Sequence, residues 1–400
     1  MNRSSRRPDG DAQSPVGTLS FFGFAVISFG GPLALAGMIA PSVIAGAGSG
    51  AGDSAGLSIL IATAVFTAPM LIWLRYSRHV NSAGGLYGFV KEAAGPRVAL
   101  AQAAIWTLSY LLYIVYTTVQ IVYDLLPGVF PGMGPWKTPL ALLIPAALCA
   151  VMVAGRRSAM LAAVALAAIQ LVLVGILDGV TLANVPFPAS SLGAGAPAGP
   201  LAKAGFQNSL LYICGSLPLF LGGELARPAL TIRRGLTGVY LLTAVVVLLA
   251  VAPLASAPAL MGAPLPAVSV AVQYSGVGLA RVVGVGLALS TAGVILAEYF
   301  ALTRLLHAVT AWALRPITLA LAVFVLAAAP LMLINPEGLY SALIKPSLVA
   351  LWVSQLIVFA VYPRFAHARG QRLLPACGLS AIASGLAIYG LVTTLQQVTS

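Results

Sequence analysis

The chain has 400 residues, of which 60% are hydrophobic and 8% are charged, and its mean hydropathy is +0.99. Because soluble domains contain about 25% charged residues, this composition excludes a soluble globular protein and predicts an integral membrane protein. The formal net charge of +12 does not indicate nucleic-acid binding, since the basic residues stand singly or in pairs at the ends of apolar segments and form no single patch.

The apolar segments predict a chain made almost entirely of membrane-spanning helices. A polar tail at 1-17 carries Arg3, Arg6 and Arg7 ahead of the first apolar segment. That segment continues to about Ala45, which favours an uncleaved first helix over a signal peptide. With about 20 apolar residues per span, the sequence predicts about eleven spans, at 18-46, 57-78, 98-126, 138-155, 158-180, 205-225, 236-258, 275-310, 316-334, 338-362 and 373-396.

The basic residues predict how the chain is oriented in the membrane. If the N-terminal tail is cytoplasmic, only Lys137 and Lys203 of the 21 Lys and Arg residues lie in outer loops, and Arg281 and Lys345 lie just inside spans. All the others then fall in cytoplasmic segments, which is the usual bias of membrane proteins. We therefore expect a cytoplasmic N-terminus and, after the last span, an extracytoplasmic C-terminus.

Two spans contain a Gly/Pro interruption, and the two interruptions occupy matching places in the two halves of the chain. The first span has the sequence Gly-Gly-Pro at 30-32, and the sixth has Gly-Ser-Leu-Pro at 215-218. A broken helix at membrane depth is tolerated only where protein or a water-filled cavity satisfies the freed backbone groups. The matching breaks therefore predict the substrate site of an inverted-repeat transporter.

The longest outer loop, rich in Pro, Gly, Ser and Ala, separates the fifth and sixth spans. We predict a first repeat of about five helices at 18-184, an extracytoplasmic linker at 185-204, a second repeat at 205-362, and an appended helix with the C-terminus at 363-400. The first span begins inside and the sixth begins outside, so the repeats have opposite topology. The expected fold is an all-α integral membrane protein built as a 5+5 inverted repeat with helices 1 and 6 broken.

Two segments carry a resemblance to a known family. The sequence SRHVNSAGGLYGFVKEAAGPR at 77-97 resembles the cytoplasmic loop after the second span of the amino acid-polyamine-organocation permeases. The exit of the sixth span, within 206-236, is similar to the pattern of the same family at Glu224, Pro228 and Arg234, and the chain departs from the family at Asn81, Arg227 and Arg233. The segment GGPLALAG at 30-37 resembles a subgroup of short bacterial permeases.

This resemblance covers about residues 18 to 310 and implies the leucine-transporter-type fold. In such a site, half-helix termini at the two breaks face the carboxylate and ammonium of an amino acid. We assign Ser28, Gly30, Gly31, Gly215 and Ser216 to that site. The alternative is that these small residues only allow close helix packing. The family often has an acid where this chain has Ser216, so a neutral amino acid is favoured over a cationic one.

The third span carries aromatic residues on one helical face, among them Tyr110 and Tyr113. In the family an aromatic residue of this helix covers the substrate, and either tyrosine is a candidate for that role, with ordinary packing as the alternative.

Candidates for ion coupling lie in the eighth span. Glu298 is about 9 Å deeper along the helix than Arg304, and an ionisable group at that depth is a functional hypothesis, here as a proton carrier. The alternative is that Glu298 reaches toward cytoplasmic arginines. Ser290 and Thr291 stand where sodium-coupled relatives supply hydroxyl ligands, although such hydroxyls also bond to their own helix. The coupling ion is therefore H⁺ or Na⁺, and no metal site, catalytic residue or other cofactor is predicted.

These features together predict a secondary active transporter of neutral amino acids in a bacterial cytoplasmic membrane, either proton-coupled or an exchanger. Exporters and sodium symporters of the same fold are alternatives, and so is a transporter-like sensor that binds its ligand without moving it. A membrane-embedded enzyme is disfavoured because the nine acidic residues are scattered and the three histidines stand apart in the sequence. The expected partners are a small-molecule substrate and the lipid bilayer, with no nucleic acid.

Overall fold

The computed structural model describes residues 15-396, and these residues form helices joined by short connections without a β-strand. The tail at 1-14, with its three arginines, and the last residues at 397-400 lie outside the described part of the chain. The helices of the first half are α1 (Thr18–Ser28), α2 (Pro32–Ala34), η1 (Leu35–Ile39), α3 (Ala40–Ala45), η2 (Ala51–Ser54), α4 (Ala55–Ser77), α5 (Leu86–Ala94), α6 (Pro96–Val119), η3 (Gln120–Leu125), α7 (Leu126–Val129), η4 (Gly134–Trp136), α8 (Lys137–Val153) and α9 (Arg156–Asn184).

The second half follows a connection that contains one turn of 3₁₀ helix. Its helices are η5 (Ala189–Leu192), α10 (Ala198–Leu210), η6 (Leu211–Glu224), α11 (Pro228–Val251), η7 (Ala252–Ser256), α12 (Pro258–Met261), α13 (Pro266–Ser275), α14 (Val277–Thr310), α15 (Leu314–Ala328), α16 (Leu331–Ile334), α17 (Pro336–Ala360), α18 (Tyr362–Ala368) and α19 (Leu373–Gln396). The helix α10 begins within the predicted linker at 185-204, so part of that linker is helical.

Within residues 15-396, ten helical segments are long and apolar enough to cross a membrane. They correspond to ten of the predicted spans, and the remaining one, at 205-225, falls on α10 and η6. The prediction of an all-α, multi-pass membrane protein is therefore confirmed. The sixth span contains the longest 3₁₀ helix of the described residues, because α10 passes within it into the 14-residue η6.

The first break follows directly from Gly30 and Gly31. Their φ angles are 77° and 72°, in the left-handed region that glycine adopts without a steric penalty. The helix α1 ends at Ser28, and a helix begins again at Pro32, whose fixed φ suits the first position of a helix. Glycine is also required by space at position 31, because a Cβ atom there would lie 2.1 Å from Ser290 Oγ.

The second break has a different form from the predicted one. The segment 215-218 is not unwound but lies inside the 3₁₀ helix η6, which runs for 14 residues. Runs of 3₁₀ helix longer than three or four residues are uncommon. The 3₁₀ geometry lengthens the segment, and its backbone groups still bond to one another. In the apolar membrane interior backbone N–H and C=O groups need such partners, and an unwound segment would not supply them.

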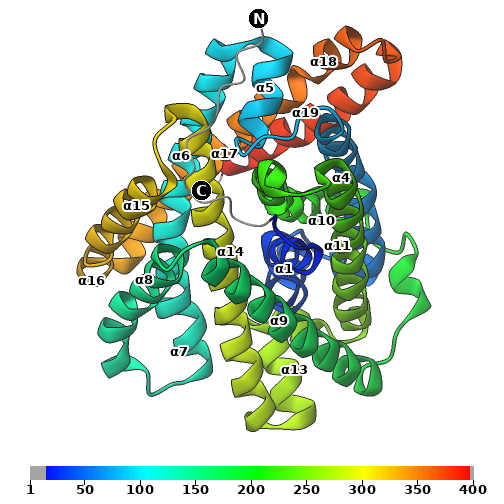
Figure 1. The fold of residues 1–400 in the computed structure, drawn as a ribbon. Helices are drawn as coiled ribbons and strands as arrows, with labels where there is room; N and C mark the ends of the chain where they lie inside the picture. Colours follow the sequence, from blue (N-terminus) through cyan, green and yellow to red (C-terminus); the bar gives the residue numbers. More distant parts are fainter. Residues whose placement is uncertain (1–14, 397–400) are drawn as a thin grey trace, which may run out of the picture.

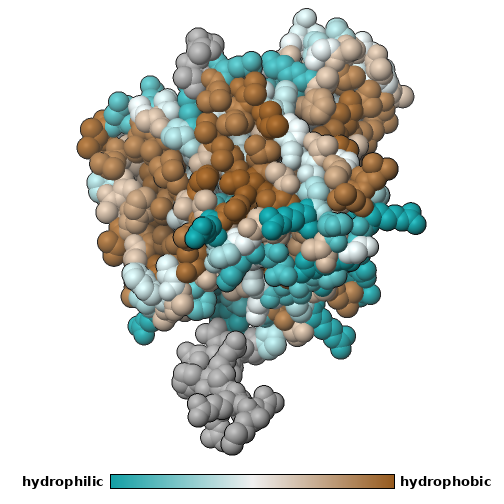
Figure 2. Space-filling model, turned by 90° about the horizontal axis from the view of Figure 1, so that it is seen from above, coloured by the Kyte–Doolittle hydropathy of each residue, from teal (hydrophilic) through white to brown (hydrophobic). Residues whose placement is uncertain are grey.

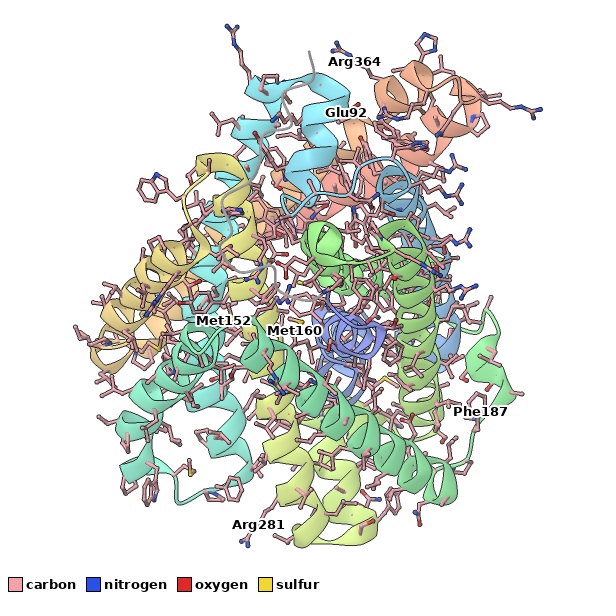
Figure 3. The ribbon with its side chains drawn as sticks, viewed as in Figure 1. Glu92, Met152, Met160, Phe187, Arg281 and Arg364 are labelled. Carbon is pink, nitrogen blue, oxygen red and sulfur yellow. The ribbon has the colours of Figure 1, made fainter. Side chains whose placement is uncertain are left out.

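Figure 1 shows α1 near the centre of the helical bundle, where it contacts α9, α11, α14 and η6. The short helices α5 and α18 lie at one end of the molecule. Glu92 of α5 forms an ion pair with Arg369, the residue that follows α18, and their Oε1 and Nη2 atoms are 2.8 Å apart. Figure 3 shows Glu92 and Arg364 at this end and Arg281 at the opposite end. These charged residues therefore mark the two ends of the helix bundle.

The surface has a hydrophobic part and a hydrophilic part. Figure 2 shows hydrophobic residues gathered over much of the upper half of that view, with hydrophilic residues concentrated below them. Many large apolar side chains are exposed, including Leu374 at 85% and Val323 at 68% of their accessible area. In water such exposure would be unfavourable, whereas a bilayer covers it, in agreement with a multi-pass membrane protein.

Candidate functional site

A cavity of about 670 Å³ leads to the first helix break. Gly46 and Lys203 are exposed residues of its lining, and Gly30 and Tyr113 are partly buried ones. The remaining lining residues come from η1, α3, η3, α10, η6, α17 and α19, and among them are Cys214 and Trp352. We call this space the outer cavity, because Lys203 belongs to the predicted extracytoplasmic linker.

Aromatic side chains form a stack beside the outer cavity. Trp106 and Tyr110 of α6 are stacked with their ring centroids 4.0 Å apart, and Phe220 of η6 lies 4.8 Å from Trp106. The Tyr110 hydroxyl lies 4.0 Å from Cys214 Sγ. Tyr110 is fully buried and Tyr113 lines the cavity, so of the two tyrosine candidates Tyr113 is the one placed to touch a molecule in it.

The first break is joined to two other helices through Ser290. The Ser290 hydroxyl donates a hydrogen bond of 2.9 Å to Oε1 of Gln170 in α9 and accepts one of 3.3 Å from the backbone N–H of Ala34. Thr291, the other hydroxyl candidate for a cation site, donates to the Leu287 carbonyl at 3.0 Å. Both hydroxyls are therefore already engaged within the protein, and Ser290 and Gln170 both lie beside Gly31 at the break.

Three of the predicted substrate residues contact other groups of the protein itself. The Ser28 hydroxyl donates to the Phe24 carbonyl at 2.6 Å, and the Ser216 hydroxyl donates to the Ile213 carbonyl at 3.2 Å. Gly215 faces the ring of Phe29, to which an added Cβ atom would approach within 2.6 Å. The structure thus brings Gly30 and Tyr113 together in the outer cavity, while Gly31 and Gly215 make close approaches to α14 and to the end of α1.

Glu298 is fully buried in α14. Neither of its carboxylate oxygens has a hydrogen-bond partner among residues 15-396. Tyr110 and Tyr113 of α6 and Cys214 of η6 lie within electrostatic range of its carboxyl group. A buried acidic group without a hydrogen bond is rare, so Glu298 calls for an explanation that packing alone does not give.

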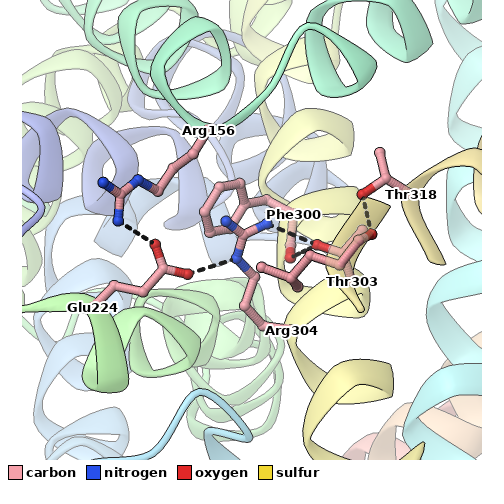
Figure 4. Close-up of polar contacts among 7 residues, drawn as sticks. Arg156, Glu224, Phe300, Thr303, Arg304 and Thr318 are labelled. Carbon is pink, nitrogen blue, oxygen red and sulfur yellow. Dashed lines mark hydrogen bonds and ion pairs between the residues drawn. The ribbon is translucent and has the colours of Figure 1, made fainter. Parts of the chain in front are cut away.

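A second cavity, of about 950 Å³, is lined by Arg156 at the start of α9, Glu224 at the end of η6 and Arg304 of α14, among others. Glu224 Oε2 is 3.2 Å from Arg156 Nη1, and Glu224 Oε1 is 2.9 Å from Arg304 Nε (Figure 4). The backbone N–H of Val16 donates to the Glu224 carbonyl at 2.9 Å. We call this space the cytoplasmic cavity, following the predicted location of its arginines.

Sequence reasoning did not find this ion-pair cluster. In the sequence, Glu224 matches a family pattern, and the arginines fit the distribution of basic residues that predicts topology. Their positions at 156, 224 and 304 are too far apart in the chain for any spacing rule to join them. The available signal was weak: Glu224 is one of only nine acidic residues and stands where a span ends.

No group of three or more His, Cys, Asp and Glu side chains that could hold a metal ion occurs in the described chain. A cation of the sodium type would depend on hydroxyl and carbonyl oxygens instead. Ser290, Thr291 and the carbonyls at the end of α1 are the groups of that kind near the first break.

Comparison with known proteins identifies the fold. The structure is similar to that of a Na⁺-coupled sialic acid symporter solved in a substrate-bound, outward-open state, with a TM-score of 0.58 and 13% sequence identity, covering 95% of this chain and 90% of that chain. No known family and no curated protein matches the sequence. The chain is therefore a multi-pass membrane protein with the leucine-transporter-type fold, as the resemblance of its loops implied.

Proposed function

We propose that the protein is a secondary active transporter that moves a small molecule across the membrane by alternating access. The observation that carries this proposal is the break of α1 at Gly30 and Gly31, with Gly30 lining the outer cavity. Irregular backbone at membrane depth is expected where it lines a cavity, and transporters place their substrate site at such discontinuous helices. The fold shared with a symporter supports the same function.

Neutral amino acids are the proposed substrates. Among residues 15-396, those that line the outer cavity include no acidic side chain, and Lys203 is the only charged one. A cationic substrate would therefore find no counter-charge on the cavity wall. The family resemblance of the segments 77-97 and 206-236 supports an amino acid permease of the amino acid-polyamine-organocation type in a bacterial cytoplasmic membrane, with repeats at 18-184 and 205-362.

For energy coupling we propose proton movement through Glu298 or simple exchange. Support comes from the buried, unbonded carboxyl group of Glu298. Sodium coupling is the second candidate, because the similar structure belongs to a Na⁺-coupled symporter and because Ser290 and Thr291 lie near the first break. For a cation to bind there, the hydrogen bond between Ser290 and Gln170 would have to break, or the two oxygen atoms that it joins would also have to contact the cation.

Counterflow in proteoliposomes tests the proposal. Vesicles are preloaded with a mixture of unlabelled neutral amino acids, and uptake of each labelled amino acid from outside is measured without an ion gradient. We expect transient accumulation of at least one neutral amino acid and none of arginine. Imposed proton or sodium gradients then distinguish the coupling ions. The absence of counterflow by correctly folded protein would contradict transport of amino acids, and binding without counterflow would favour a sensor.

A further inference from the structure

The two arginines that hold Glu224 are arranged to receive a carboxylate. Each takes a different oxygen of the same carboxyl group, at 3.2 Å for Arg156 and 2.9 Å for Arg304. Hydrogen bonds between guanidinium and carboxylate groups are among the strongest in proteins and define the orientation of the bound group. Glu224 therefore shows where a carboxylate is bound in the cytoplasmic cavity and which atoms bind it.

Arg304 keeps its position through contacts other than the one with Glu224. Its Nη1 atom donates to the Thr303 hydroxyl at 2.9 Å, and its guanidinium carbon lies 3.4 Å from the centroid of the Phe300 ring (Figure 4). The Phe300 ring in turn packs on Phe24 of α1, with centroids 5.2 Å apart. The side chain of Arg304 is only 5% exposed. The binding geometry is thus preformed on α14.

The cytoplasmic cavity has more positive than negative groups on its wall. Arg156, Arg304 and Arg315 line it, together with His307, and among the lining residues within 15-396 Glu224 is the only acidic one. One carboxylate therefore faces three guanidinium groups. Such a wall attracts anions and orients them toward the arginines.

The arginines and the glutamate belong to different parts of the fold. Arg156 begins α9 and Arg304 lies in α14, and these two helices are tied together by the bond between Gln170 and Ser290. Glu224 ends η6, the segment that carries the second break. If η6 moves relative to α9 and α14, as alternating access requires, Glu224 leaves and two guanidinium groups remain. Arg304, whose side chain is 5% exposed, then loses its carboxylate partner, and a buried charge without its counter-charge is unfavourable.

We propose that Arg156 and Arg304 form a carboxylate-binding site, which Glu224 occupies in this conformation and which the carboxylate of the transported molecule occupies once Glu224 has moved away. This inference rests on the proposed transport function and adds to it a second substrate contact on the cytoplasmic side. Glu224 and the substrate carboxylate then compete for the same two guanidinium groups, so the arrival of the one releases the other.

Chemical modification of arginine tests the site without a transport assay. The full-length protein in lipid nanodiscs is treated with phenylglyoxal, and modification of Arg156 and Arg304 is measured by mass spectrometry, with the exposed residues Arg233 and Arg364 as internal references. In Glu224→Gln we expect modification of both to increase at least about fivefold. Sodium isobutyrate and L-leucine should reverse the increase, whereas L-leucinamide, which lacks a carboxylate, should not.

Equal protection by leucinamide, or no protection by isobutyrate, would overturn the proposal. Protection by isobutyrate in a protein that shows no amino acid counterflow would support the site and refute the proposed substrate, so the two failures are distinguishable.

A kinetic measurement adds a second criterion. Arg304→Lys keeps the charge but loses the forked donor geometry, and we expect the KM measured from the cytoplasmic face to rise about tenfold while the KM from the outer face stays unchanged. Arg315→Lys is the matched control, since Arg315 lines the same cavity and no ion pair joins it to Glu224 in the described chain. An equal rise of both KM values in Arg304→Lys would indicate a merely structural role.

Discussion

The two helix breaks occupy matching places in the two halves of the chain, but they are built differently. At the first, Gly30 and Gly31 adopt left-handed backbone angles and the helix stops and restarts. At the second, the chain keeps a continuous helical path as η6 and tightens from α to 3₁₀ geometry. The difference shows that a pair of Gly/Pro interruptions predicts where helices are irregular without predicting the form of the irregularity.

The largest expected effect is that of Gly31→Ala. The left-handed angle costs an L-residue about 1–2 kcal/mol, and the contact with Ser290 Oγ adds an overpacking cost of about 1–3 kcal/mol. We expect a strongly lowered melting temperature in detergent and loss of counterflow. Gly238→Ala in α11 is the control, because an added Cβ atom meets nothing within 4 Å there. Equal behaviour of the two variants would show that the first break does not need glycine.

The next effect is that of Gly215→Ala at the second break. Position 215 has no positive φ, so the cost comes only from the close approach to the Phe29 ring and should be about 1–3 kcal/mol. Thermal unfolding of Gly215→Ala, Phe29→Leu and the double variant measures this contact. The double variant should be more stable than the sum of the single effects predicts. Simple additivity would mean that the ring does not limit the size of residue 215.

A smaller difference in stability is expected between variants of the two serines near the breaks. Ser290→Ala removes a bond to Gln170 and leaves the Ala34 N–H without its side-chain acceptor, which should cost about 1–3 kcal/mol. Ser216→Ala removes only a bond to a carbonyl of its own helix and should change stability by about 0.5 kcal/mol or less. Thermal unfolding of both variants gives the comparison, and a more destabilised Ser216→Ala would reverse this ranking.

The smallest effect on stability is expected for Glu298→Gln, because the carboxyl group makes no hydrogen bond to residues 15-396 that the amide would lose. If Glu298 carries the coupled proton, this variant should keep counterflow and lose accumulation driven by a pH gradient. Ser290→Ala is the variant for comparison, because its hydroxyl belongs to the first break and to the alternative of sodium coupling, and not to the proposed proton carrier. Unchanged pH-driven accumulation in Glu298→Gln would exclude the residue as the proton carrier.

Hydropathy and the Gly/Pro positions were enough to predict the fold class, because span length and backbone satisfaction in a membrane depend on local sequence. The position of the first break also followed from glycine at 30 and 31. The 3₁₀ form of η6 did not follow, since Gly215 and Pro218 are compatible with either an unwound or a tightened segment. Contacts between distant spans, such as the one that joins Arg156, Glu224 and Arg304, depend on how the helices cross and had no local signal.

The geometry of η6 has a consequence for its length. A 3₁₀ helix rises about 2.0 Å per residue and an α-helix about 1.5 Å, so the 14 residues of η6 extend over about 28 Å instead of about 21 Å. That is close to the thickness of the hydrocarbon layer, which is about 30 Å. A return of η6 to α geometry would shorten it by about 7 Å. Glu224, at the end of η6, would then move along the helix axis relative to Arg156 and Arg304.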